Sequence, residues 1–196
     1  MPRVSHALLA CVFVPLSAMA APQTYVMDPM HTFPNFTVNY LGMTTLHGRF
    51  DKVAGKIVLD QAGKTGSLEA RITTASVSTG DAKRADGGRS RDEHLRTPDF
   101  FNSSEFPEMV YKSTKFNFNG DALESVEGTL TLLGVTKPVK LTVDAFKCGP
   151  HPFNKKPVCG ADAEGSFKRT DFGMKFGVPA ISDDVKLSFS VLAYQE

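Results

Sequence analysis

The chain has 196 residues, of which 41% are hydrophobic and 22% are charged, a composition typical of a folded globular protein. Its formal net charge is +1, and without residues 1–20 it is 0, because loss of Arg3 leaves 21 basic residues (22 minus 1) against 21 acidic ones. This balance opposes nucleic acid as a partner, since neutralising phosphates requires a basic excess. It also opposes a polybasic surface for anionic membranes.

Residues 1–20 have the features of a cleaved secretory signal peptide. Arg3 supplies the positive start, residues 7–16 form a short apolar run, and residues 18–20 (AMA) form a cleavage signal of the small-x-small type. The run is too short to cross a bilayer as a helix, so a retained membrane anchor is the weaker alternative. We therefore expect a single domain, residues 21–196, that is exported to the periplasm or secreted.

Strands with alternating apolar and polar residues dominate the rest of the chain and predict an all-β fold. In chain order, they are expected near residues 36–40, 55–59, 67–72, 109–118, 126–132, 139–143, 161–168 and 185–191. About eight antiparallel strands with one apolar face each must stack as two sheets or close into a barrel. The alternation alone leaves the filled sandwich and the barrel equally favoured.

Residues 79–101 break the strand pattern and predict a short helical insert. Their charge and low content of β-branched residues suit one or two short helices, with a linker at residues 87–88. Within this insert, residues 91–96 can form a helix with Asp92 and Glu93 at its positive N-terminal end.

The end of this insert should direct two aromatic rings inward. Pro98 should stop the helix, because the residue before a proline disfavours the helical conformation. Asp99 would then cap a turn that brings Phe100 and Phe101 to the apolar interior. We interpret His94 as a brace within the insert, with Asp99 as its partner, and the whole insert as a plug or lid.

Cys148 and Cys159 are the two cysteines that remain once Cys11 leaves with residues 1–20. An even pair in an exported chain predicts a disulfide, which at this loop length stabilises the fold by about 3 kcal/mol. The alternative is half of a zinc site. His151 is its only nearby nitrogen ligand and the chain lacks a second cysteine pair, which disfavours zinc.

Catalytic and metal-binding motifs do not stand out in the sequence. It has no Gly-x-Ser-x-Gly elbow, no His-Glu-x-x-His and no glycine-rich phosphate loop before a helix. The spacing of the histidines gives no metal pattern, and we interpret them as structural: His31, His47, His94 and His151. A hydrolase or metal enzyme would need His31, His47 or His94 to meet carboxylates in a cleft.

Two pairs of adjacent carboxylates are also interpreted as structural. Asp92 and Glu93 form one pair, and Asp183 and Asp184 form the other. Neighbours in sequence point apart on a helix or a strand, so both pairs are expected at the solvated surface. We therefore expect a protein that is not an enzyme and that needs no metal or cofactor.

Six stretches of the chain, taken together and in order, resemble one family. They are YVMDPMHT (25–32), LHGRFDKVAGKIVLD (46–60), RDEHLRTPDFF (91–101), FPEMVYKSTKF (106–116), VEGTLTLLGVTKPVKL (126–141) and FKRTDFGM (167–174). The set is similar to the bacterial YceI-like family of exported lipid-binding proteins. The resemblance implies an extended, lipocalin-like barrel of eight antiparallel strands around a long isoprenoid or other amphiphilic chain. It also implies a periplasmic or secreted location, a homodimer, and isoprenoid quinones as candidate ligands.

The resulting hypothesis is a periplasmic lipid carrier that contacts the membrane transiently during lipid exchange. The tail of such a lipid must be enclosed by the protein, because each methylene exposed to water costs about 0.8 kcal/mol. The alternative is a non-catalytic envelope stress or interaction protein with a filled barrel. The residues expected to line the interior are Phe36, Val38, Leu68, Ile72, Leu95, Phe100, Phe101, Leu130, Leu132, Leu141, Val143, Phe167, Leu187 and Phe189.

Overall fold

The computed structural model describes residues 21–196, so the expected signal peptide lies outside the described residues. Within this part of the chain, eleven strands form one antiparallel sheet. The strands are β1 (Gln23–Met27), β2 (Phe33–Tyr40), β3 (Thr44–Phe50), β4 (Val53–Asp60), β5 (Thr65–Thr73), β6 (Val77–Ser78), β7 (Glu108–Asn119), β8 (Ala122–Leu132), β9 (Val135–Pro150), β10 (Pro157–Lys168) and β11 (Ile181–Gln195). The helical elements are the α-helix α1 (Arg91–Leu95) and the 3-10 helices η1 (Thr74–Ser76) and η2 (Arg169–Phe172).

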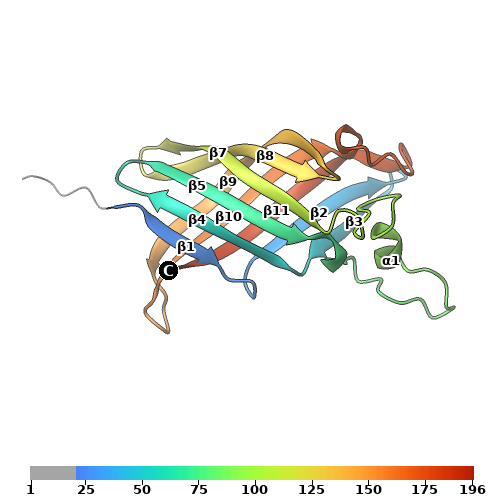
Figure 1. Ribbon diagram of the computed structural model, residues 1–196, viewed down its shortest axis with the longest axis horizontal. Coiled ribbons are helices and arrows are strands. Elements are labelled where there is room, and N and C mark those ends of the chain that lie inside the picture. Colours follow the sequence, from blue (N-terminus) through green and yellow to red (C-terminus); the bar gives the residue numbers. More distant parts are fainter. Residues whose placement is uncertain (1–20) are drawn as a thin grey trace, which may run out of the picture.

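Eight of these strands close into a barrel (Figure 1). Their order is β1-β4-β5-β7-β8-β9-β10-β11, and β1 closes the ring by pairing with β11, with Tyr25 opposite Gln195 and Met27 opposite Ala193. The prediction of an all-β, eight-stranded antiparallel barrel is confirmed, and the two-sheet sandwich is wrong. Closure is compatible with the alternation, because a barrel buries one face of every strand, and it also leaves no exposed edge in the ring.

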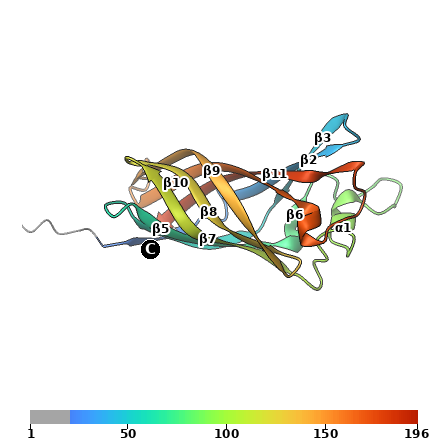
Figure 2. The same cartoon turned by 90° about the horizontal axis from the view of Figure 1, so that it is seen from above.

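The remaining strands extend the wall beyond the ring at one end. The first part of β11 pairs with β2, with Leu187 opposite Phe36, and β2 continues into β3 and the short β6. Figure 2 shows the β2–β3 hairpin projecting from the barrel near α1. The strand predicted at residues 36–40 thus lies in this extension, whereas β1, which was not predicted, completes the ring. It was missed because its apolar residues, Tyr25, Val26 and Met27, are consecutive and do not alternate with polar ones.

Tyr111 shows how the barrel interior satisfies a polar group. Its side chain is buried, and its hydroxyl donates to the carbonyl oxygens of Val126 (3.2 Å) and Val139 (3.1 Å). Burial raises the pKa of this hydroxyl above its usual value, with the charge of Glu127 adding to the effect. The ring lies against Gly128 of β8, where a methyl group would collide with it.

The predicted disulfide between Cys148 and Cys159 is confirmed. The two residues lie directly opposite each other on β9 and β10 and join the strands next to their connecting loop. The zinc alternative is wrong, since both sulfur atoms are used by the disulfide. The described residues contain no group of three His, Cys, Asp or Glu side chains arranged to hold a metal ion.

The insert between β6 and β7 carries one α-helix, α1, in agreement with the prediction of one or two short helices. The helix ends at Leu95, one residue before the expected boundary, and Arg96 caps it. Among residues 21–196, no helix has the length and apolar character to span a membrane.

Candidate functional site

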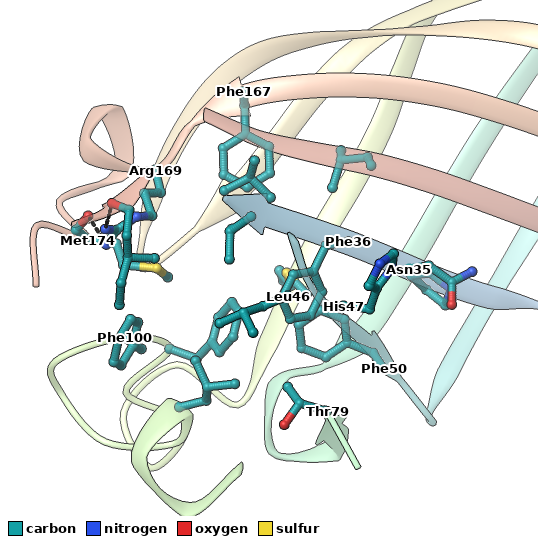
Figure 3. Close-up of a pocket in the computed structure, with 18 of the residues that line it drawn as sticks. Asn35, Phe36, Leu46, His47, Phe50, Thr79, Phe100, Phe167, Arg169 and Met174 are labelled. Atoms are coloured by element: carbon teal, nitrogen blue, oxygen red, sulfur yellow. Dashed lines mark hydrogen bonds between the residues drawn. The ribbon is translucent and has the colours of Figure 1, made fainter. Parts of the chain in front are cut away.

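A cavity of about 330 Å³ opens at the end of the barrel that carries α1 and the β2–β3 hairpin. We call it the wide cavity. Its volume lies near the lower end of the range of small-molecule sites, roughly 300–1,000 Å³. Figure 3 shows Phe36, Leu46 and Phe50 projecting into this space from the extension of the barrel wall. The strands β5, β7, β8, β10 and β11 and the insert complete a mostly apolar lining.

Aromatic rings form much of this lining. The ring of Phe50 lies 5.6 Å from that of Phe36 and 5.2 Å from that of Phe101, measured between centroids. The rings of Phe100 and Phe176 lie 5.4 Å apart, and each is 5.0 Å from the imidazole of His94. Packing of this kind presents large apolar faces with little loss of side-chain freedom.

A second cavity of about 90 Å³, the narrow cavity, lies further along the barrel between all eight strands of the ring. Its lining is almost entirely apolar. The hydroxyls of Thr32 and Tyr111, which border it, are already bonded to backbone carbonyls. Pro34, Ile72 and Phe189 line both cavities, so the two are arranged in series along the barrel.

Arg169 is a buried cation at the rim of the wide cavity. It is 2% exposed, and its guanidinium donates to four carbonyl oxygens of residues 174–182. The acceptors are Ser182 (2.9 Å), Met174 (3.2 Å), Phe176 (2.8 Å) and Ile181 (2.9 Å). Burial lowers the pKa of this guanidinium from its usual value, opposed by the charge of Asp183, and the group stays protonated at neutral pH. Arg169 therefore holds the loop that presents Met174 and Phe176 to the cavity (Figure 3).

The helix α1 covers the other side of the mouth and is firmly capped. The Ser90 hydroxyl accepts from the Glu93 amide (3.1 Å), and the Glu93 carboxylate accepts from the Ser90 amide (2.8 Å). This reciprocal capping box satisfies two amides that the helix itself leaves unpaired. The helix places His94 and Leu95 in the lining of the wide cavity.

The predicted partnership of His94 with Asp99 is confirmed, with Nε2 and Oδ2 2.8 Å apart. The expectation that Asp92 is a solvated carboxylate is wrong. Asp92 is 1% exposed, and its Oδ1 accepts from both the backbone amide (2.8 Å) and the hydroxyl (2.6 Å) of Thr79. A buried charge requires such partners, and this one ties α1 to the loop that follows β6.

Thirteen of the fourteen predicted interior residues line a cavity. Those of the wide cavity alone are Phe36, Val38, Leu95, Phe100, Phe101, Leu130, Phe167 and Leu187. Leu68, Leu141 and Val143 line the narrow cavity alone, and Ile72 and Phe189 line both. The exception is Leu132, which is 1% exposed and packs in the core without bordering either cavity. Whether the thirteen contact a ligand stays a prediction.

Several residues of the wide cavity were not predicted. Leu46, Met109, Met174, Phe176 and Ile181 all line it. Met174 and Phe176 lie in a loop, where no periodic pattern could indicate a buried side. Met109 is the second residue of β7, and Ile181 is the first residue of β11, four residues before the predicted strand begins.

The four histidines do not gather at one site, because His47 and His94 line the wide cavity whereas His31 and His151 border neither cavity. His31 pairs with Asp28 through its Nδ1, 2.6 Å away, and the side-chain hydrogen bond from His31 lowers the pKa of that carboxyl. The Nδ1 of His151 faces the amides of Phe153 and Asn154 at 3.3 Å. These contacts agree with the structural interpretation of both residues.

Comparison with known proteins finds the family described as the YceI-like domain, whose model matches residues 25–193. The chain is 35% identical over 181 residues to a protein named YceI from Escherichia coli O157:H7, covering 92% of this chain and 90% of that protein.

Two solved structures are also similar. The YceI protein of Campylobacter jejuni has a TM-score of 0.67 and 26% identity, over 81% of this chain and 90% of that one. A polyisoprenoid-binding domain from Saccharophagus degradans has a TM-score of 0.60 and 18% identity, over 89% of this chain and 99% of that one. At that identity, the second similarity shows a shared fold.

Proposed function

The chain belongs to the YceI-like domain family, and on that premise we propose that it is a carrier for a long-chain isoprenoid or other amphiphilic lipid. The lipid tail lies within the barrel, and isoprenoid quinones are among the candidate ligands. The similarity to a structure described as a polyisoprenoid-binding domain supports this ligand class.

The observation that carries the proposal is the pair of apolar cavities in series, joined at Pro34, Ile72 and Phe189. A tail that runs from the wide cavity into the narrow one is removed from water at about 0.8 kcal/mol per methylene. Most polar side chains of the lining belong to the wide cavity, and His47 and Arg91 are two of them. A polar head therefore fits at the mouth. The cavities also favour a carrier over an interaction protein with a filled barrel.

We further infer that residues 21–196 act as one domain in the periplasm or outside the cell, without catalysing a reaction. The disulfide supports an oxidising compartment, where such bonds persist. Arg169, which a catalytic site could employ, is instead bonded to backbone carbonyls. A homodimer is proposed from the family resemblance.

Mass spectrometry of bound lipid tests this function. Protein purified without detergent is extracted with organic solvent, and separately mixed with a geranylgeraniol solution before native mass spectrometry. We expect the protein to carry co-purified or added lipid in stoichiometric amount. Leu187→Asn places an amide in the wide cavity and should weaken binding, whereas Val58→Asn, at a partly exposed position of β4, should not. A protein that repeatedly carries no lipid and binds none would refute the carrier.

A further inference from the structure

Exposed apolar side chains gather around the mouth of the wide cavity. Among the described residues, nine large apolar side chains are exposed, and five of these lie on two loops at this end of the barrel. They are Tyr40, Leu41, Met43, Phe176 and Val178, which we call the mouth patch. Met43 is 86% exposed and Leu41 is 50% exposed.

The mouth patch is one surface and is continuous with the cavity. The amide of Leu41 donates to the carbonyl of Ala180 (2.7 Å), and Tyr40 lies opposite Ile181 in the sheet. These contacts join the β2–β3 hairpin to the loop that precedes β11. Tyr40 and Phe176 are partly exposed and also line the wide cavity. An apolar path therefore leads from the outer surface into the barrel.

The β2–β3 hairpin holds Leu41 exposed, in a backbone conformation that is unfavourable for leucine. Leu41 (φ 58°) and Gly42 (φ 66°) form a two-residue turn in which the Met43 amide donates to the Tyr40 carbonyl (3.0 Å). Asn, Asp or Gly is favoured at the first of these positions, and leucine is not. Leu133 has the same backbone conformation, but its side chain packs against the core. Leu41 belongs to neither core cluster.

The charge around the mouth patch is low and positive. Residues 39–46 carry no charged side chain, and residues 173–181 carry only Lys175. Apolar side chains with a nearby cation suit the interface of a bilayer that contains anionic lipid. A stable interface with a second protein takes about 20–30 residues from each side, many more than the five side chains of this patch.

We propose that the mouth patch docks on the surface of a lipid bilayer and brings the open end of the barrel against it. A lipid then moves between membrane and cavity without its tail entering water. The purpose of this docking surface rests on the proposed function, but docking itself can be measured without a bound ligand.

Single tryptophans report the docking directly, because the chain contains none. Met43→Trp places the probe in the mouth patch. Met30→Trp is the matched control, since Met30 is 75% exposed and lies in the loop between β1 and β2, outside the mouth patch, beside Asp28 and without a lysine or arginine. With vesicles of phosphatidylcholine and phosphatidylglycerol, the emission of Met43→Trp should shift to shorter wavelength and be quenched by brominated acyl chains. The emission of Met30→Trp should not change.

The double variant Leu41→Asn, Met43→Asn separates docking from lipid binding. Asparagine suits the turn at position 41, so the fold should be retained. Loss of two apolar side chains should weaken vesicle binding about tenfold or more. Binding of geranylgeraniol in solution, measured by native mass spectrometry, should be unchanged because neither residue lines a cavity.

Each alternative result is distinct. Unchanged emission of Met43→Trp, or equal vesicle binding of the double variant and the wild type, would overturn the docking surface while leaving the carrier intact. If the wild type did not bind geranylgeraniol, this result would instead count against the carrier function. A dimer without vesicles, dissociated by the double variant in analytical ultracentrifugation, would assign the patch to a second copy and also overturn the proposal.

Discussion

Ile72 of β5 and Phe189 of β11 line both the wide and the narrow cavity, so these two side chains stand at the junction of the tube. Their size decides how easily a tail passes from one cavity into the other. Phe189→Ala should therefore let the barrel hold longer chains. Native mass spectrometry with isoprenols of increasing length should show the longest bound chain increase relative to the wild type.

Leu132→Ala is the control for this experiment. Leu132 is buried but borders neither cavity, so its truncation should lower the free energy of unfolding by about 2–5 kcal/mol. The preferred chain length should stay the same. If both variants changed the length preference equally, the junction would have no special role.

The bond between Asp92 and Thr79 should control the stability of the lid. Asp92→Ala removes the acceptor for the amide and the hydroxyl of Thr79. The free energy of unfolding should fall by about 2–4 kcal/mol, because two donors lose a charged partner. Hydrogen exchange should accelerate in residues 79–95. Asp86→Ala, which alters an exposed ion pair with Arg84, should leave exchange in α1 unchanged.

These residues show where the sequence was informative. Alternation predicted eight of the strands and ten side chains of the lining, because each inward position repeats every second residue. It could not predict that Asp92 is buried, since that depends on a bond to Thr79 from a loop without regular structure. Met174 and Phe176 were missed for a related reason. Arg169 positions their loop by donating to backbone carbonyls, and such bonds cannot be inferred from the order of side-chain types in the sequence.

The disulfide should stabilise the end of the barrel remote from α1. Replacing Cys148 and Cys159 by alanine should lower the free energy of unfolding by about 3 kcal/mol, given a sequence separation of 11. Denaturant titration measures this change. Binding of a short isoprenol should persist, because Cys148 and Cys159 do not line the wide cavity. Equal stability with and without the bond would contradict the expected role.

Asp183 should contribute an acid-sensitive part of the stability. It accepts from the Thr170 amide and hydroxyl, both at 2.9 Å, and the amide bond is the main cause that holds its pKa below 3.8. Because the pKa of Asp183 is lowered in the folded state, its carboxylate stabilises the fold at pH values above the ordinary pKa of 3.8. This stability is lost as the pH falls through the lowered pKa of the folded state.

Urea titrations at several pH values test this contribution. The difference in unfolding free energy between the wild type and Asp183→Asn should be constant near neutral pH and should shrink as the pH falls below about 4. A difference that stays constant down to the acid transition would mean that Asp183 titrates alike in the folded and unfolded states.

Photo-crosslinking tests the central claim, that a lipid tail lies along the barrel, most directly. An isoprenol with a diazirine at the end of its tail is bound and irradiated, and the adducts are mapped by mass spectrometry. We expect adducts on side chains of the narrow cavity, such as Leu68, Leu141 and Val143. Adducts confined to exposed positions such as Met30 and Phe153 would contradict it.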